Sequence, residues 1–335
     1  MVSIADVAAR AGVSQTTVSH TLSGKRAVSP QVQARVRAAM AELGYRPRRT
    51  AQNLAEGRTR LVGLIVPDIS NSFFAELAKG IEEAAIRAEY NLVLCNSGFN
   101  HEREVLYLET IQSRAVDGVV YATGAPPTDS ELASLLGDLP LVLVDEEVPG
   151  ARAPLFVSDN EKGGRLVAEH LRALGHTRAA VISTQGLVSA QNRTDGFVRT
   201  WREAGCPPPV VVDGGFTYDG GVAAAGELLE AVRRERITAV FATNDLMALG
   251  AVARFEQAGL GCPADVSIVG FDDIAFAGLV RPRLTTVRQD VAQLGQQAAR
   301  ALIDALEEKK PLTPTRRVFA VELHVRESSG PPARS

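Results

Sequence analysis

The sequence lacks the features that mark secreted, zinc-binding and membrane-spanning proteins. Its 335 residues include three cysteines, Cys95, Cys206 and Cys262, which lie far apart with no CxxC pair and no histidine at metal-ligand spacing. This spacing favours reduced thiols over disulfides or a zinc site. The chain starts without a basic segment followed by an apolar run, and it contains no run of about eighteen apolar residues. We therefore expect a cytoplasmic protein with no metal and no membrane segment.

Motifs of common enzyme classes are also missing. The sequence contains no GxGxxG, no GxxxxGK followed by Ser or Thr, no GxSxG and no HExxH. His101, His170 and His324 have no obvious nucleophile beside them. We predict no catalytic residue and no cofactor, and an enzyme is the least favoured of the function classes considered.

The charge is distributed unevenly along the chain. Residues 1–60 contain ten Lys/Arg and three Asp/Glu, a net charge of +7, whereas residues 61–335 contain 26 and 36, a net charge of −10. The whole chain is 45% hydrophobic and 22% charged, which is typical of a globular protein, and its length suggests a small domain followed by a large one. The asymmetry indicates a polyanion-binding module attached to something else.

The basic segment has the pattern of three short helices. A first helix begins at Ser3, which is followed by an acid three positions later as in a capping box, and it ends at Gly12. Ser14 can cap a second helix after a turn of about four residues. Ser29-Pro30 opens a third helix, whose apolar stripe ends at Gly44. The first pair is a helix-turn-helix.

The second of these helices is well suited to reading DNA. It carries no Lys, Arg, Asp or Glu and offers Gln15, Thr16 and His20 on one side, while arginines flank it. Short polar side chains can reach base edges in the major groove, and arginines can hold phosphates. The alternative is that the segment is a solvated basic helical face with no partner.

Several motifs resemble one known family. Val7-Ala-Ala-Arg-Ala-Gly-Val-Ser14, Thr17-Val18-Ser19, Glu42-Leu-Gly-Tyr45-Arg-Pro47 and Ala51-Gln-Asn-Leu54-Ala55 are similar to the headpiece and hinge of the lactose/galactose-repressor family of bacterial regulators. In that family, residues at the positions of Gln15, Thr16 and His20 read bases, although arginine is frequent at position 20. The resemblance implies a DNA-binding set of Ser14, Gln15, Thr16, Thr17, Ser19, His20, Ser29, Tyr45, Ala51 and Leu54.

A hinge is expected between the headpiece and the rest of the chain. Ala51, Leu54 and Ala55 share one helical face, but a segment of seven or eight residues does not hold a helix alone. The resemblance implies that two such segments pair in a dimer and that Leu54 is wedged into the minor groove, which kinks DNA. The alternative is that Leu54 packs on its own effector domain.

From Leu61 onward, short apolar runs alternate with amphipathic helices, which predicts α/β structure with doubly wound parallel sheets. The resemblance implies a two-lobed, periplasmic-binding-protein-like effector domain. The predicted parts are a headpiece at 1–48, a hinge at 49–60, an effector-binding and dimerisation domain at 61–327 and a disordered tail at 328–335. Within the effector domain, we expect one lobe at about 61–157 and 288–312 and the other at about 158–287 and 313–327.

Polar and aromatic residues follow the predicted strands. Ligands of open α/β sheets bind at the carboxyl ends of the strands, and this mixture of carboxylates, amides, one arginine and aromatic rings suits a sugar or another polyol. The resemblance implies effector contacts at Phe73, Phe74, Asp145, Ser189, Arg193, Phe216, Asn244, Asp272 and Gln289. Alternatively, Asp159, Asn244, Asp245 and Asp272 cap helices or turns, and Phe73 or Phe74 belongs to the core.

Together these observations predict a ligand-controlled DNA-binding transcriptional regulator. The resemblance implies a homodimeric repressor on a near-palindromic operator, and sugars are the favoured effectors, although a purine or a phosphocarrier-protein partner stays open. The tail has no leucine heptads, so no tetramerising extension is expected. The alternative from another class is a sugar-binding receptor without a DNA role.

Overall fold

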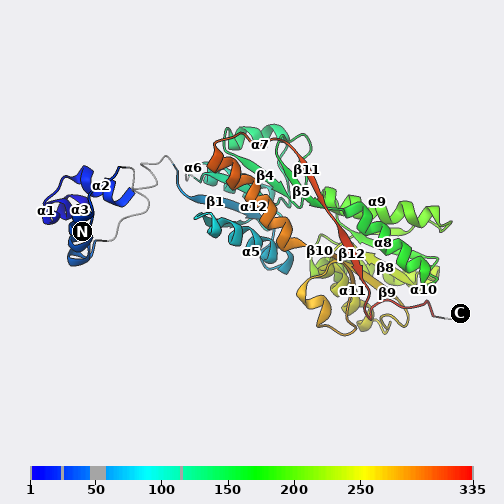
Figure 1. Cartoon of the computed structure of the whole chain (residues 1–335). Helices are drawn as coiled ribbons and strands as arrows, with labels where there is room; N and C mark the ends of the chain where they lie inside the picture. Colours follow the sequence, from blue (N-terminus) through cyan, green and yellow to red (C-terminus); the bar gives the residue numbers. More distant parts are fainter. Residues whose placement is uncertain (1, 24–25, 46–57, 114–115, 334–335) are drawn as a thin grey trace. The chain divides into compact units, whose positions relative to one another are not determined.

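The computed structural model describes residues 2–23, 26–45, 58–113 and 116–333, and the chain divides into two compact units, Met1–Arg60 and Leu61–Ser335 (Figure 1). The predicted hinge residues 49–57, including Ala51 and Leu54, lie outside the described residues.

The first unit contains the three predicted helices, α1 (Ile4–Ala11), α2 (Gln15–Ser23) and α3 (Pro30–Leu43). The capping box at the start of α1 is present, because the Ser3 hydroxyl accepts the N–H of Asp6 and the Asp6 carboxylate accepts the N–H of Ser3. Gly12 ends α1 with a φ of 63°, a left-handed conformation that glycine adopts without steric cost. Ser29 precedes α3 as expected, but its side chain makes no capping hydrogen bond.

A small apolar core joins the three helices. Its buried side chains are Val7, Ala8, Ala11, Val18, Val36 and Ala39. Val18 of α2 is fully buried, and its burial fixes which face of that helix points outward. The helical spacing of apolar residues was therefore sufficient to predict this core.

The first lobe of the second unit is built on a six-stranded parallel sheet with the order β11-β5-β4-β3-β1-β2. Its strands are β1 (Leu61–Val66), β2 (Asn91–Asn96), β3 (Gly118–Tyr121), β4 (Leu141–Val144), β5 (Leu155–Ser158) and β11 (Arg316–Phe319). Alternate residues of the strands pack against helices on opposite faces. One face carries α5 (Ser72–Arg87) and α12 (Val291–Glu308), and the other carries α6 (His101–Ser113) and α7 (Asp129–Leu136) (Figure 1).

The second lobe repeats this layering on a sheet with the order β12-β10-β9-β8-β6-β7, in which β12 runs antiparallel to β10. Its strands are β6 (Ala179–Ser183), β7 (Val210–Asp213), β8 (Ala239–Ala242), β9 (Ser267–Asp272), β10 (Thr285–Gln289) and β12 (Val321–His324). One face carries α8 (Asn160–Ala173) and α9 (Val188–Glu203). The other carries α10 (Tyr218–Glu235) and α11 (Asp245–Gln257), and a short 3-10 helix, η1 (Ala275–Gly278), follows β9.

Two expectations about the lobes need correction. Residues 313–327 were assigned to the second lobe, but Arg316–Phe319 pairs with β5 in the first sheet, and the strand that joins the second sheet is Val321–His324. The chain thus passes between the lobes after β5, after β10 and after β11. A run of ten residues with strand propensity does not reveal that the chain changes sheet within it.

The predicted disordered tail also begins too early. Ser328 is fully buried, and its hydroxyl donates to the carbonyl of Ile268 and accepts the N–H of Thr285. Buried His176 contacts the Gly330 carbonyl through Nε2 and the Thr238 hydroxyl through Nδ1. Residues 328–330 are therefore held on the second lobe by hydrogen bonds that sequence composition does not show.

The described part of the chain contains no helix that is both long and apolar enough to cross a membrane.

Candidate DNA-binding and effector-binding sites

The predicted base-reading residues lie on the outer side of α2. Gln15 and Thr16 are exposed and His20 is partly exposed, while Val18 is buried in the core. Ser19, which also belongs to the predicted DNA-binding set, is exposed as well. A buried residue with exposed neighbours on the opposite side leaves one polar helical face free to enter a groove. The arrangement presents short hydrogen-bonding side chains without a local charge.

Ser14, Thr17, Ser29 and Tyr45 also belong to the predicted DNA-binding set. The Ser14 hydroxyl accepts the N–H of Thr17 at 3.1 Å and lies 2.9 Å from the Thr17 hydroxyl, so Ser14 caps α2. Ser29 is exposed, and Tyr45 packs partly against the headpiece core. Arg10 is held by an exposed ion pair with Glu42 at 2.6 Å.

Arg193 is the centre of the predicted effector site. It lies on α9 with only 1% of its surface exposed. Its Nε donates to Asn160 Oδ1 at 2.8 Å, and its Nη1 donates to the Thr243 carbonyl at 2.7 Å and to Asp272 Oδ1 at 3.4 Å. A buried charge is tolerated only when it is paired and hydrogen-bonded, and these contacts meet that requirement.

Three other predicted residues gather around Arg193. Gln289 Nε2 donates to Asp272 Oδ1 at 2.7 Å, and the Asp145 carboxylate is near enough to interact electrostatically with both Arg193 and Asp272. Asp145 follows β4 of the first lobe, whereas Asp272 and Gln289 end β9 and β10 of the second. The strand ends of both lobes therefore contribute to one cluster, as the topology rule for open sheets predicts.

Two acceptors of this cluster have no protein partner. Asp145 Oδ1 and Gln289 Oε1 are buried side-chain oxygens without a hydrogen bond. A buried acceptor without a donor costs about 1 to 3 kcal/mol. A ligand that donates hydrogen bonds to these atoms would remove that cost.

Burial dominates the ionisation of the cluster. It raises the pKa of Asp145 to about 6, and the nearby Arg193 guanidinium opposes this rise. Burial also raises the pKa of Asp272, against the influence of Arg193 and the Gln289 hydrogen bond. The site therefore contains carboxyl groups that lack enough positive partners, a condition often found at functional sites.

Aromatic rings enclose the guanidinium. The Arg193 Cζ lies 3.9 Å from the centre of the Phe271 ring and 5.9 Å from that of Phe216. Phe216 was predicted as a site residue, but Phe271 and Asn160 were not. Their positions in the apolar run of β9 and at the start of α8 gave no sign of a polar role, because only the fold brings them to Arg193.

The capping alternatives apply to some residues and not to others. Asn244 and Asp159 both cap helices, since their Oδ1 atoms accept the N–H of Met247 and of Lys162. Asp245 is not a cap, because its oxygens accept the Thr286 hydroxyl and the Ile274 N–H. Asn244 Nδ2 donates to the Phe216 carbonyl, so both ends of this predicted effector contact are already engaged.

Ser189 is also engaged by the protein. Its hydroxyl donates to Glu146 Oε2 at 2.6 Å, and its N–H lies 3.2 Å from the same oxygen. Glu146 is buried next to Asp145 and was not predicted as a site residue, since nothing in the sequence distinguishes it from Glu147. Burial raises the pKa of Glu146 to about 7, and the Ser189 hydrogen bond opposes this rise.

Phe73 and Phe74 both lie in an apolar cluster that includes residues of both lobes. Their rings meet edge to face with centres 5.0 Å apart. We expected one of the two in the core, and the structure buries both. A second ring contact, between Phe99 after β2 and Phe216 of the second lobe, has a centre distance of 6.3 Å.

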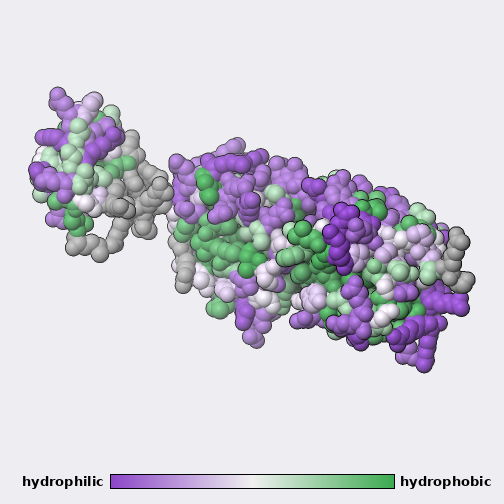
Figure 2. All heavy atoms as spheres, turned by 90° about the horizontal axis from the view of Figure 1, so that it is seen from below, coloured by the Kyte–Doolittle hydropathy of each residue, from purple (hydrophilic) through white to green (hydrophobic). Residues whose placement is uncertain are grey.

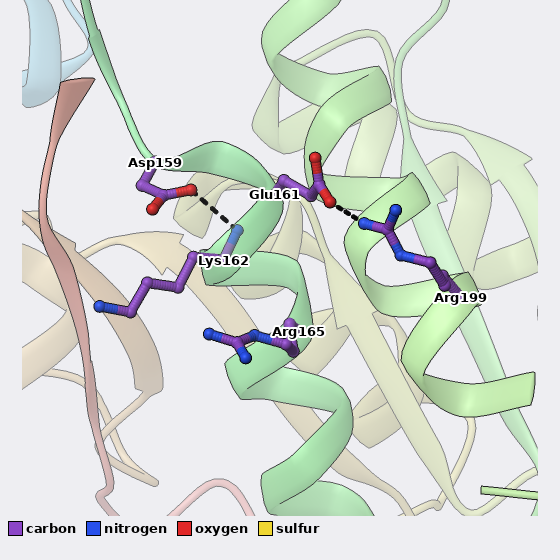
Figure 3. Close-up of a pocket in the computed structure, with 5 residues that line it drawn as sticks. All are labelled: Asp159, Glu161, Lys162, Arg165 and Arg199. Atoms are coloured by element: carbon purple, nitrogen blue, oxygen red, sulfur yellow. Dashed lines mark hydrogen bonds and ion pairs between the residues drawn. The ribbon is translucent and has the colours of Figure 1, made fainter. Parts of the chain in front are cut away.

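A surface pocket elsewhere on the second lobe has a volume of about 460 Å³ and contains none of the predicted effector residues. Figure 3 shows its charged lining, in which Glu161 pairs with Arg199 and Asp159 caps α8. The ion pair is more than half exposed, so it contributes little to stability. Among the described residues, no group of three His, Cys, Asp or Glu could hold a metal ion.

The chain is similar to known regulators over nearly all its length. Residues 3–48 match the family model for bacterial regulatory proteins of the lacI family, and residues 168–329 match a periplasmic binding protein-like domain. The HTH-type transcriptional regulator DegA of Bacillus subtilis (strain 168) is 34% identical over 336 residues, which covers 98% of both chains.

Two solved structures extend the similarity to the fold. A Lac repressor dimer bound to operator and the anti-inducer ONPF has a TM-score of 0.85 and 28% identity, with 98% of this chain and 99% of that chain covered. The transcriptional regulator CelR in complex with cellobiose has a TM-score of 0.71 and 33% identity, with 98% and 100% covered.

Proposed function

The chain belongs to the lacI family of bacterial regulatory proteins, and from this premise we propose that it is a homodimeric repressor whose affinity for a near-palindromic operator is controlled by a sugar. The observation that carries the effector half is the buried cluster of Arg193, Asp145, Asp272 and Gln289, which contains two unpartnered acceptors. We assign the protein no catalytic reaction and no cofactor.

The exposed face of α2 supports the DNA half of the proposal. Gln15, Thr16 and Ser19 point away from the headpiece core, and the surrounding segment is strongly basic. Such a face can read base edges while arginines hold phosphates. A sugar receptor without a DNA role has no use for this headpiece, so we set that alternative aside.

The chemistry of the cluster favours a neutral effector rich in hydroxyl groups. The cation of the cluster, Arg193, already contacts Asp272, and Asp145 Oδ1 has no hydrogen-bond donor. An anionic ligand such as a sugar phosphate would add repulsion to these carboxyls, whereas a sugar hydroxyl can donate to Asp145 Oδ1 and Gln289 Oε1. The similar regulator CelR binds cellobiose, which is consistent with this class.

Exposed apolar side chains support the proposed homodimer. Ile86 on α5, Leu94 on β2, and Phe276 and Leu279 at η1 are among the large hydrophobic residues exposed on the second unit. Figure 2 shows hydrophobic side chains gathered on the side of the first lobe where Figure 1 places α5. Covering such surfaces with a second copy would remove them from water, and both lobes would contribute.

Effector control requires that the sugar favour one arrangement of the lobes. Asp145 belongs to the first lobe and Arg193 to the second, so a ligand that binds both favours the closed arrangement. A coupling free energy of about 1 to 3 kcal/mol changes operator affinity about 5- to 150-fold.

A ligand screen followed by operator binding tests this proposal. The full chain is tested by thermal shift against neutral mono- and disaccharides, sugar phosphates and purines, and each compound that binds is added to an operator titration. We expect a neutral sugar to raise the melting temperature and weaken DNA binding. A compound that strengthens DNA binding would make the protein a corepressor-dependent repressor.

Two variants serve as controls for the screen. Arg193→Lys removes the planar fork that contacts Asn160 and Asp272 together, so it should abolish the sugar response. Arg199→Lys alters an exposed ion pair and should not. Binding of sugar phosphates or purines alone, or a response that survives Arg193→Lys, would refute the proposed effector class and site.

A further inference from the structure

Glu146 joins the two lobes beside the proposed effector site. It follows β4 of the first lobe, and its carboxylate accepts hydrogen bonds from the start of α9 in the second lobe. Oε1 accepts the N–H of Val188 at 2.7 Å, and Oε2 accepts the N–H and the hydroxyl of Ser189 at 3.2 and 2.6 Å. With 2% of its surface exposed, Glu146 is removed from water by this contact.

The start of α9 has no acceptor of its own. Its N-cap residue, Leu187, offers no side-chain hydrogen bond, and its first turn contains no acid. In contrast, α8, α10 and α11 are capped locally by Asp159, Thr217 and Asn244. The first N–H groups of a helix need acceptors, and a carboxylate is favoured there by the helix dipole. For α9, that carboxylate comes from the opposite lobe.

This contact also positions Asp145 relative to Arg193 in the proposed effector site. Ser189 and Arg193 are one turn apart on the same face of α9, and Glu146 is next to Asp145 in the chain. When Glu146 holds Ser189, Asp145 is therefore placed near the Arg193 guanidinium, with which it interacts electrostatically. The Glu146–Ser189 and Asp145–Arg193 pairs align the residues that follow β4 in the first lobe with α9 of the second lobe.

We propose that Glu146 is a positioning residue that holds the lobes closed around the effector site by capping α9. This inference rests on the proposed function of the cleft but concerns a residue that the sequence motifs do not assign. In this closed state the Ser189 hydroxyl donates its hydrogen bond to Glu146, and the Arg193 cluster binds the effector. The stability of the Glu146 contact then determines how much of the effector's binding free energy is spent on closing the lobes.

The test measures closure in the effector-free full chain, so it does not depend on knowing the sugar or the operator. Hydrogen exchange followed by mass spectrometry reports on peptides covering Val188 and Ser189, and small-angle X-ray scattering reports on lobe opening. Glu146→Ala should speed exchange of these amides about tenfold or more, because a charge-assisted capping contact is lost. It should also increase the radius of gyration.

Three further variants separate positioning from general destabilisation. Glu146→Gln keeps an acceptor oxygen and should restore part of the protection. Ser189→Ala removes the hydroxyl donor and leaves the two backbone N–H donors of the other lobe, and the double variant with Glu146→Ala should exchange no faster than Glu146→Ala alone. Glu147→Ala changes a neighbouring acid that pairs with Arg316 within the first lobe, so exchange and scattering should match the wild type.

Wild-type exchange at Val188 and Ser189 in Glu146→Ala, or additive effects of the Glu146 and Ser189 variants, would overturn this role. Such a result would leave the proposed function intact, because sugar-dependent operator binding is measured separately. If Glu146→Ala does not fold, Glu146→Gln and Ser189→Ala give the same comparison from each side of the contact, and wild-type exchange in both would equally overturn it.

Discussion

The two candidate sites are built in opposite ways. In the headpiece, Gln15, Thr16 and Ser19 are exposed on one helix, and a separate apolar core holds that helix in place. In the effector domain, Arg193 and Asp272 are buried and are held by one another. Binding and stability are therefore separable in the first site and inseparable in the second.

The largest expected effect comes from removing the buried cation. Arg193→Leu removes the donor to the Asn160 amide oxygen and the Thr243 carbonyl, and it leaves the buried Asp272 carboxylate without its cation and with the Gln289 hydrogen bond alone. Breaking a buried pair by removing one partner costs about 3 to 5 kcal/mol, and we expect that loss in the free energy of unfolding of the effector domain. Urea unfolding followed by circular dichroism measures it.

Arg199→Leu is the matched control for this prediction. Arg199 lies on the same helix and pairs with Glu161, but the pair is more than half exposed. We expect a change of about 1 kcal/mol or less. Equal effects of the two leucine variants would mean that burial does not distinguish these arginines.

A smaller effect should appear as a dependence of stability on pH. The pKa values of Asp145 and Glu146 are raised to about 6 and about 7, so the folded state binds more protons than the unfolded state between about pH 4 and 7. The free energy of unfolding of the effector domain should therefore fall as pH rises through this window.

In the headpiece the trend has the opposite sign. Hydrogen bonds from the Ser3 backbone and side chain lower the pKa of exposed Asp6, so its contribution is present at neutral pH and is lost as pH falls below its ordinary value. Thermal unfolding from about pH 2 to 8 tests both trends. Asp145→Asn should make the free energy of unfolding of the effector domain depend less on pH. An unchanged dependence would show that Asp145 does not contribute to it.

The smallest effect on stability is expected on the exposed face of α2. Gln15→Ala should change the free energy of unfolding by about 0.5 kcal/mol or less, since the side chain packs against nothing in the core. The same change should weaken operator binding by about 1 to 3 kcal/mol if Gln15 reads a base. A gel-shift titration of the full chain measures this.

Gln191→Ala provides the control for that titration. Gln191 is an exposed glutamine at the start of α9, where its amide donates to Asp195. The Gln191→Ala variant should therefore bind the operator with unchanged affinity. If Gln15→Ala bound the operator as tightly as this control, the proposal that Gln15 reads a base would be wrong. If Gln15→Ala unfolded the headpiece, binding and stability would not be separable there.

Local sequence patterns were enough to predict most elements. Helical spacing with a serine cap and a terminal glycine located α1, and alternating apolar runs and helices located both sheets. Helix starts were less well predicted. The structure begins α9 at Val188, and its first turn is stabilised by Glu146, a residue 42 positions away from Val188 that local patterns do not identify.

The sequence by itself determined the helix-turn-helix, the basic headpiece, the α/β class and most of the polar residues that gather around Arg193. These properties depend on local spacing, on charge and on motifs, which are readable along the chain. Only the tertiary structure decided the sheet to which β11 belongs, the burial of residues 328–330, and the roles of Phe271, Asn160 and Glu146. Each of these depends on which distant segments meet, because a side chain acquires its partner and its pKa from neighbours that the chain order does not reveal.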